Sequence, residues 1–157
     1  TTQGYFRRPK DDAKSKIDHD GRRWHRMGDV GWMDEEGRLW FCGRKSQRVR
    51  TGGQTMFTAC VEAVFNEHPK VLRTALVGQG TPGQEVPVLL VECHKNRQPQ
   101  SKSERESLIS DLQAMGRQHP LTHPVQRILL HPTFPVDARH NAKIRREELR
   151  EWAEKRA

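Results

Sequence analysis

The stretch Trp40–Gly53, which reads Trp-Phe-Cys-Gly-Arg-Lys-Ser-Gln-Arg-Val-Arg-Thr-Gly-Gly, constrains this chain more than any other. Two apolar-rich stretches flank it, and it holds a dense group of cations: Arg44, Lys45, Arg48 and Arg50. Gly43 ends a strand-like run, and Gly52-Gly53 predicts a tight turn because glycine tolerates positive φ. A short basic segment between two turns is typical of a joint that carries positive charge to an anionic ligand. An exposed basic hairpin is the simpler alternative.

The composition limits the size of the hydrophobic core and indicates the charge of the partners. Of 157 residues, 33% are hydrophobic and 31% charged, which predicts a modest core in one domain or a small domain plus a piece of another. The net charge of +8 and the pI of about 9.9 favour anionic partners such as nucleotides, nucleic acid, acidic protein or an anionic membrane.

The cysteines, the lengths of the apolar runs and the first residue predict where the protein is located and whether the chain is part of a longer one. The three cysteines have no close spacing, so neither a disulfide framework nor a Cys-x-x-Cys zinc pattern is visible, which favours a reducing cytosol. No apolar run reaches transmembrane length and no signal peptide opens the chain, so we expect a cytoplasmic protein. The chain starts at Thr1 without an initiator Met, and we therefore expect an internal piece of a longer protein.

The first 43 residues predict a small antiparallel β meander. Asp20-Gly21 is a hairpin turn signal before a strand over residues 22–27, and residues 28–31 predict a turn. Two further short strands, over 32–33 and 38–42, flank a turn at 34–37. Three tryptophans at eight-residue spacing are then packing residues or the cover of a neighbouring domain: Trp24, Trp32 and Trp40.

The rest of the chain predicts an α+β layer. A hairpin spans residues 47–57, and a helix over 58–68 has Thr58 as its candidate N-cap. Strands at 71–77 and 86–93 precede a helix that runs from a capping box at 103–106 to about Gly116. A third strand at 125–130, a loop at 131–141 and a helix at 143–155 complete the order. This order predicts a β-hairpin and a three-stranded sheet with flanking helices.

Four sequence patterns stand in a consistent order along this layout. They are His25–Asp29, Gly43-Arg44, Arg50-x-x-Gly53 and Asn141–Ile144. Together they resemble the adenylate-forming (ANL) superfamily of acyl-CoA synthetases, peptide-synthetase adenylation domains and luciferases. Residues 25–29 resemble its Tyr-Arg-Thr-Gly-Asp motif, residues 43–53 its Gly-Arg-x-Asp-x-x-x-Lys-x-x-Gly hinge, and Ala142-Lys143 its terminal Gly-Lys. Val61-Glu62 and His68–Val71 follow the hinge as in the family.

The resemblance implies a domain organisation. Residues 1–43 would be the end of the large N-terminal adenylation domain, residues 44–53 the hinge, and residues 54–157 the small C-terminal lid domain. The family's phosphate loop, adenine pocket and magnesium carboxylate would then lie upstream, so the isolated chain is expected to be inactive. ATP or AMP, with Mg²⁺ held by upstream residues, are the implied cofactors.

The resemblance also implies roles for single residues. Asp29 would accept hydrogen bonds from the ribose hydroxyls of ATP or AMP, since a carboxylate offers two acceptor oxygens. Arg44 would be a second nucleotide contact. Lys143 would be the catalytic lysine that bridges the acyl carboxylate and the α-phosphate, where electrostatic stabilisation is usually the largest catalytic effect. The simpler alternatives are a turn aspartate, a surface arginine and a solvated lysine at a helix start.

Further residues are implied at the hinge and around the lysine. Ser46, with Gly43 and Lys45, stands where the family rotates its small domain between two half-reactions. The supporting residues are Arg50, Gly53 and Asn141. Met27, Ser46, Ala142 and residues 58–60 depart from the family pattern, and the serine makes a strict rotation mechanism a weaker expectation.

The residues around positions 43–49, 57–62 and 139–144 resemble one branch most, the β-lactone synthetases of long-chain olefin biosynthesis, often labelled fatty acyl-CoA ligases. This implies ATP-dependent activation of a long-chain β-hydroxy acid and closure to a β-lactone, with release of AMP and pyrophosphate. An ordinary fatty acyl-CoA synthetase is the alternative within the family, so the use of coenzyme A stays open.

Partners implied by the resemblance are the upstream adenylation domain, a long-chain β-hydroxy or fatty acid, and other enzymes of the same pathway. No metal site is expected in this chain, because its eight histidines show no diagnostic spacing. A basic nucleic-acid-binding module is the alternative from another class. The charge permits it, but only 6% of residues are aromatic and no RNA-binding motif is visible.

Overall fold

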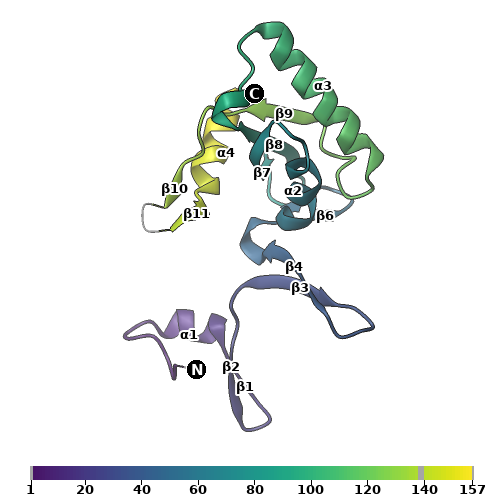
Figure 1. Ribbon diagram of the computed structural model, residues 1–157. Helices are drawn as coiled ribbons and strands as arrows, with labels where there is room; N and C mark the ends of the chain where they lie inside the picture. Colours follow the sequence, from purple (N-terminus) through teal and green to yellow (C-terminus); the bar gives the residue numbers. More distant parts are fainter. Residues whose placement is uncertain (1, 138–139, 157) are drawn as a thin grey trace. The chain divides into compact units, whose positions relative to one another are not determined.

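The computed structural model describes residues 2–137 and 140–156 (Figure 1). The chain divides into two compact units, Thr1–Ser46 and Gln47–Ala157. We call them the N-terminal unit and the C-terminal unit and describe each by itself. No helix in the described part of the chain is long and apolar enough to cross a membrane.

The N-terminal unit consists of one short helix and two separate hairpins in place of a single meander. Its elements are α1 (Pro9–Ser15), β1 (Lys16–His19), β2 (Arg22–His25), β3 (Asp29–Met33) and β4 (Leu39–Arg44). β1 pairs only with β2 and β3 only with β4. The predicted turn at Asp20-Gly21 is confirmed: both residues have positive φ, at 50° and 68°, as a two-residue hairpin loop requires. Helix α1, with Pro9 in its first turn, was not predicted.

The β3–β4 hairpin corrects the turn predicted over residues 28–31. Gly28 alone makes the turn, with a φ of 78°, and Asp29 is already the first residue of β3. Gly43 has a φ of 116° beside an irregularity in the β3–β4 register. A side chain at Gly31 would meet the Trp40 carbonyl oxygen at 2.7 Å, so glycine lets the two strands approach.

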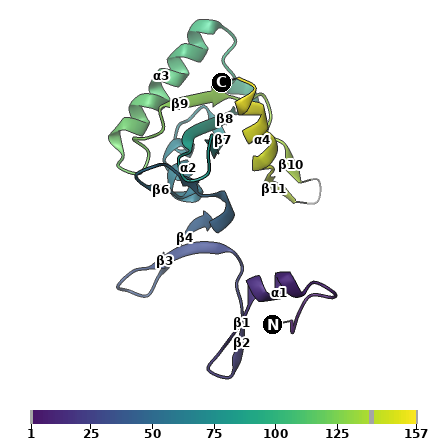
Figure 2. The same cartoon turned by 180° about the vertical axis from the view of Figure 1, so that it is seen from behind.

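The C-terminal unit contains the three-stranded sheet and flanking helices that the sequence predicts. Its sheet order is β7-β8-β9, with β7 antiparallel to β8 and β8 parallel to β9 across the α3 crossover (Figure 2). The elements from the joint onward are η1 (Lys45–Gln47), β5 (Val49–Arg50), β6 (Thr55–Met56), α2 (Thr58–Asn66), β7 (Val71–Gln79), β8 (Val86–Cys93), η2 (Lys95–Arg97), α3 (Lys102–Gln118), β9 (Arg127–Leu130), β10 (Val136–Asp137), β11 (His140–Ile144) and α4 (Arg146–Glu154).

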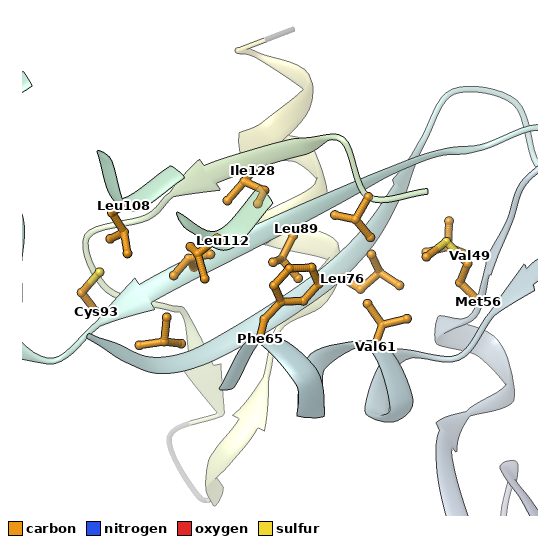
Figure 3. Close-up of a cluster of buried hydrophobic side chains, with 13 residues drawn as sticks. Val49, Met56, Val61, Phe65, Leu76, Leu89, Cys93, Leu108, Leu112 and Ile128 are labelled. Atoms are coloured by element: carbon orange, nitrogen blue, oxygen red, sulfur yellow. The ribbon is translucent and has the colours of Figure 1, made fainter. Parts of the chain in front are cut away.

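The sheet of this unit is covered on both faces. Alternate residues of β7 and β8 point to opposite sides, so Leu76 and Leu89 face α2 and α3, while Ala75 and Leu90 face α4. Figure 3 shows the first cluster, in which the Phe65 ring lies among the leucines of the sheet and the helix α3. Phe65 is fully buried, and its ring contacts Gly116, which has no side chain to displace it.

Three helix starts differ from the sequence predictions. Thr58 is the first buried residue of α2 and not its N-cap. Helix α3 is capped by Ser101, whose hydroxyl accepts from the Glu104 N–H, two residues before the capping box predicted at Ser103. The C-terminal helix begins at Arg146, because residues 140–144 pair with β10 as a strand.

Candidate functional site

Asp29 and Arg44, the two residues expected to contact nucleotide, lie side by side in the N-terminal unit. They face each other across the β3–β4 register, and Arg44 Nε is 3.1 Å from Asp29 Oδ1. Arg44 Nη1 also donates to the Met27 carbonyl oxygen at 2.6 Å, which fixes the guanidinium beside the Gly28 turn. Both side chains are partly exposed, at 37% for Asp29 and 50% for Arg44. The pair therefore presents a carboxylate and a guanidinium together at one end of a hairpin.

The predicted hinge residues Gly43, Lys45 and Ser46 lie at and directly after the end of β4. Gly43 is buried in β4, and the Lys45 N–H donates to the Gly28 carbonyl oxygen at 2.8 Å, so Lys45 is tied to the Asp29 turn. Ser46 is exposed in η1, at the division between the two units. The predicted hinge at 44–53 includes this division.

The supporting residues Arg50 and Gly53 lie in the β5–β6 hairpin of the C-terminal unit. The Arg50 backbone exchanges two hydrogen bonds with Glu85: its N–H donates to the carboxylate, and its carbonyl accepts from the Glu85 N–H, both at 2.8 Å. The turn at Gly52-Gly53 does not use positive φ, contrary to the prediction. Instead, Thr51 and Gln54 close it by backbone and hydroxyl hydrogen bonds. The contacts of Arg50 with Glu85 are thus made by its main chain and not by its guanidinium.

Lys143 lies in a different place from the expected helix start. It is exposed in β11, the second strand of a hairpin in which Val136 pairs with Ile144. The Arg145 N–H donates to the Pro135 carbonyl oxygen at 2.9 Å and closes the base of this hairpin. We call the paired strands β10 and β11 the lysine hairpin. Asn141 belongs to β11, and its side chain lies outside the described part of the structure.

A buried ion pair holds the chain directly after the lysine hairpin. Arg146 binds the Glu62 carboxylate with both terminal nitrogens, at 2.6 and 2.8 Å, and the two side chains are only 14% and 10% exposed. Glu62 Oε1 also accepts from the Leu76 N–H at 2.7 Å, while the Leu76 carbonyl accepts from Arg146 at 3.3 Å. Burial raises the pKa of the Glu62 carboxyl, and the bonds from Arg146 and Leu76 offset part of that rise.

A second buried carboxylate holds the chain directly before the lysine hairpin. Glu92 of β8 is 6% exposed, and its Oε2 accepts from the Phe134 N–H at 2.9 Å and from Arg73 Nε at 2.7 Å. Phe134 is buried among residues of α4 and the sheet. The lysine hairpin therefore lies, in the sequence, between two residues that buried carboxylates bind, Phe134 before it and Arg146 after it.

Sequence reasoning found only part of this arrangement. Glu62 was noticed only as part of a family pattern, whereas Glu92, Phe134 and Arg146 were missed. A single acid within the apolar run of β8 is a usable signal, because a buried carboxylate needs partners. Its partners are 19 and 42 positions away, at Arg73 and Phe134, and no local pattern gives them.

Two other features of the described residues do not enter the site. No group of three or more His, Cys, Asp or Glu side chains that could hold a metal ion is found among them. A cavity of about 460 Å³ between α3, β9 and the end of α4 contains none of the predicted site residues.

The solved structures that resemble this chain define its class. An amide bond synthetase from Marinactinospora thermotolerans superposes with a TM-score of 0.75 at 28% identity, over 96% of this chain and 28% of that one. The o-succinylbenzoate coenzyme A synthetase of Bacillus subtilis, solved with AMP, gives 0.70 at 26% identity, over 94% of this chain and 27% of that one. No family model matches the sequence. The chain belongs to the adenylate-forming ANL superfamily, as the C-terminal part of such an enzyme.

Curated relatives narrow the comparison to particular proteins. The chain is 51% identical to the olefin β-lactone synthetase of Xanthomonas campestris over 98% of its own length, and 49% identical to that of Stenotrophomonas maltophilia over 99%. A 2-succinylbenzoate–CoA ligase from Bacillus cytotoxicus is 40% identical over 57% of the chain. The chain spans 28–29% of the length of the two olefin β-lactone synthetases.

Proposed function

We propose that this chain is the C-terminal part of an ATP-dependent ligase that activates a long-chain β-hydroxy acid and closes it to a β-lactone. One observation carries the proposal. Identity to olefin β-lactone synthetases is near one half over almost the whole chain, whereas the 2-succinylbenzoate–CoA ligases reach 32–42% over 35–62% of it. The likeness to β-lactone synthetases therefore extends through both units.

The first step we propose is adenylation. A carboxylate oxygen of the acid attacks the α-phosphorus of ATP, the bond to the β-phosphate oxygen breaks, and pyrophosphate leaves. Negative charge accumulates on the α-phosphate oxygens in the transition state, and a positioned ammonium stabilises it. We assign this role to Lys143, since its exposed position on a hairpin suits a side chain that reaches a ligand.

The second step we propose is ring closure. The β-hydroxyl oxygen attacks the carbonyl carbon of the acyl-adenylate, its proton is lost, and AMP leaves with the bonding electron pair. Coenzyme A takes no part in this sequence. In a fatty acyl-CoA synthetase, a coenzyme A thiolate would attack the same carbon and the product would be a thioester.

Nucleotide recognition is the role we propose for the N-terminal unit. Asp29 would accept hydrogen bonds from the two ribose hydroxyls, and Arg44 would orient that carboxylate and contact the nucleotide. The ion pair between them supports this assignment, because a guanidinium on one carboxylate oxygen restricts the rotation of the other. The hinge role proposed for residues 44–53, with Ser46 at its centre, would let the C-terminal unit rotate between the two steps.

A larger adenylation domain is the partner that we propose for the N-terminal unit. Nine of the twelve exposed large hydrophobic residues in the described chain belong to this unit: Tyr5, Phe6, Trp24, Met27, Trp32, Met33, Leu39, Trp40 and Phe41. So much exposed apolar surface in a unit of this size is typical of a segment that another domain covers. We assign Mg²⁺ to ligands outside this chain and a cytoplasmic location to the whole ligase.

The test uses the longer protein that contains this chain. It is incubated with a long-chain β-hydroxy acid, ATP and Mg²⁺, with and without coenzyme A, and the product is identified by mass spectrometry. We expect a product lighter than the acid by one water, formed without coenzyme A. A thioester formed only with coenzyme A would show that the longer protein is an acyl-CoA synthetase and not a β-lactone synthetase. If no acid is activated, both assignments are wrong.

A pyrophosphate-exchange assay of the longer protein tests the proposed catalytic lysine. Lys143→Ala should slow pyrophosphate exchange about 100-fold or more while ATP still binds, because the ammonium acts on charge that develops in the transition state. Lys155→Ala, an exposed lysine after α4, is the control. Unchanged exchange in the Lys143 variant would remove that residue from the mechanism.

A further inference from the structure

The lysine hairpin is joined to the rest of the C-terminal unit at two buried carboxylates, one at each end. Before the hairpin, Glu92 accepts the Phe134 N–H; after it, Glu62 binds Arg146. Lys143 is three residues before Arg146 in the sequence, so the second contact lies close to the lysine along the chain. The residues between the two contacts include β10 and β11.

The Glu62 contact joins three elements at one point. β7 is an edge strand of its sheet. The ion pair supplies hydrogen-bond partners for both backbone polar groups of Leu76: the N–H donates to Glu62, and the carbonyl oxygen accepts from Arg146. Glu62 comes from α2, on one face of the sheet, and Arg146 begins α4, on the other face. A bidentate pair has one favourable orientation, so it fixes the first turn of α4 and the strand that precedes it.

The Glu92 contact is built in the same way from other groups. Its carboxylate is shared between Arg73, on the neighbouring strand β7, and the main chain of Phe134. The Arg73 guanidinium also lies over the Phe134 ring, 5.5 Å from its centroid. Phe134 is therefore held by its N–H, its ring and its burial.

We propose that Glu62 and Glu92 are positioning residues that hold the lysine hairpin in the orientation from which Lys143 acts. This proposal rests on the function proposed above for Lys143. Neither carboxylate touches substrate; each acts through the chain that it holds. A buried hydrophobic pair could supply as much stability as an ion pair, but it would lack the directionality of the charge-assisted hydrogen bonds, three at Glu62 and two at Glu92.

The first arm of the test is amide hydrogen exchange in the longer protein, which needs no activity. Glu62→Gln removes the charge and keeps the size of the side chain, and Glu92→Gln does the same at the other end. Each variant should speed exchange in β10, in β11 and at Arg145 and Arg146 about tenfold or more while α3 keeps its protection, because local opening can occur without global unfolding. Unchanged exchange in this segment for both variants would overturn the proposal.

The second arm is kinetic and separates positioning from stability. Displacing a catalytic group by about 1 Å can cost about 100-fold in rate, so each Gln variant should lose about 10- to 100-fold in kcat for adenylation with little change in KM for ATP. Leu108→Ala, at a buried core position on α3, is the control for stability loss at a distance from the hairpin. It should keep its kcat at a temperature at which all variants are folded.

The outcomes distinguish this proposal from the one on which it rests. If the wild-type protein exchanges pyrophosphate and Lys143→Ala does not, but both Gln variants keep the wild-type kcat, the positioning role is wrong and the function stands. If Lys143→Ala is fully active, the function assigned to the lysine fails, and the positioning role fails with it. A fall in kcat of the Leu108→Ala control equal to that of the Gln variants would also overturn the positioning role, because stability alone would then explain it.

Discussion

The two units of this chain differ in how each is held together. The C-terminal unit contains 111 residues around a sheet covered on both faces, and almost all buried hydrophobic residues of the described chain lie in it. Among the described residues of the N-terminal unit, the buried ones are Cys42 and Gly43. Yet the N-terminal unit carries the proposed nucleotide contacts. The comparison teaches that strand pairing and a few hydrogen bonds, without a hydrophobic core, position Asp29 and Arg44 relative to each other.

The largest expected effect of this difference appears when the units are separated. Residues 47–157 alone should unfold cooperatively, since they contain both hydrophobic clusters, whereas residues 1–46 alone should show no cooperative transition, because isolated hairpins are marginal in water. Thermal unfolding followed by circular dichroism measures both. A cooperative transition in residues 1–46 would contradict the comparison.

Single substitutions give the next largest effect. Phe65→Ala in the C-terminal unit should lower the free energy of unfolding of the chain by about 3–5 kcal/mol, because it empties a filled core position. Trp32→Ala in the N-terminal unit should lower it by at most about 1.5 kcal/mol, the scale of its stacking on Trp40. Urea titration measures both values. In the longer protein we expect the Trp32 substitution to cost more, and an equal cost in both contexts would count against a domain that covers this surface.

A smaller effect is expected on ligand binding. Asp29→Asn should raise the KM for ATP in the longer protein by about 10- to 100-fold, since charged hydrogen bonds contribute about 1.5–3 kcal/mol. The unfolding temperature of the C-terminal unit should not change. Asp20→Asn is the matched control, because Asp20 is an exposed turn residue with positive φ, a conformation that asparagine also adopts. Equal KM values for the two variants would remove Asp29 from nucleotide binding.

The smallest expected effect is a pH dependence confined to the C-terminal unit. Burial lowers the pKa of His131 below its ordinary value of 6.5, where its ring lies against Phe134 and Trp152. The unfolded chain therefore takes up a proton first as the pH falls below 6.5, and stability that is complete above this pH is lost. His131→Phe should reduce that loss between pH 7 and pH 5.

The control for this prediction is His123→Phe, at an exposed histidine, which should leave the loss unchanged. Some loss should persist in the His131 variant, because burial also lowers the pKa of His68. Unfolding free energies from urea titrations at both pH values measure these differences. A pH dependence identical to that of the wild type in the His131 variant would contradict the prediction.

Local signals predicted much of the fold. The strand β8 was predicted at its observed bounds, because Val86–Cys93 is an apolar run, interrupted only by Glu92, between turn residues. The Asp20-Gly21 turn was predicted from two residues whose backbone preferences are strong. The start of α3 was misplaced by two residues, since Ser101 and Ser103 each stand three residues before a glutamate, and both pairs fit a capping box.

Pairing between strands decided what the sequence could not predict. Residues 143–145 fit a helical pattern with Leu149 and Trp152, but Ile144 pairs with Val136 in a strand, so Lys143 lies on a hairpin. The Asp29–Arg44 contact was not predicted either, because it depends on the register of two strands. The family resemblance named the candidate residues, whereas only the structure shows which groups hold them.

The ion pair between Glu62 and Arg146 also fixes an order of events during protein synthesis. The two residues are 84 positions apart, so at about 5–20 residues per second the ribosome adds Arg146 about 4 to 17 seconds after Glu62. During that interval, full burial of the Glu62 carboxylate would leave a charge without its counter-ion. The contact of Glu62 with the edge of β7 can thus be completed only after Arg146 has been synthesised, which is three residues after Lys143.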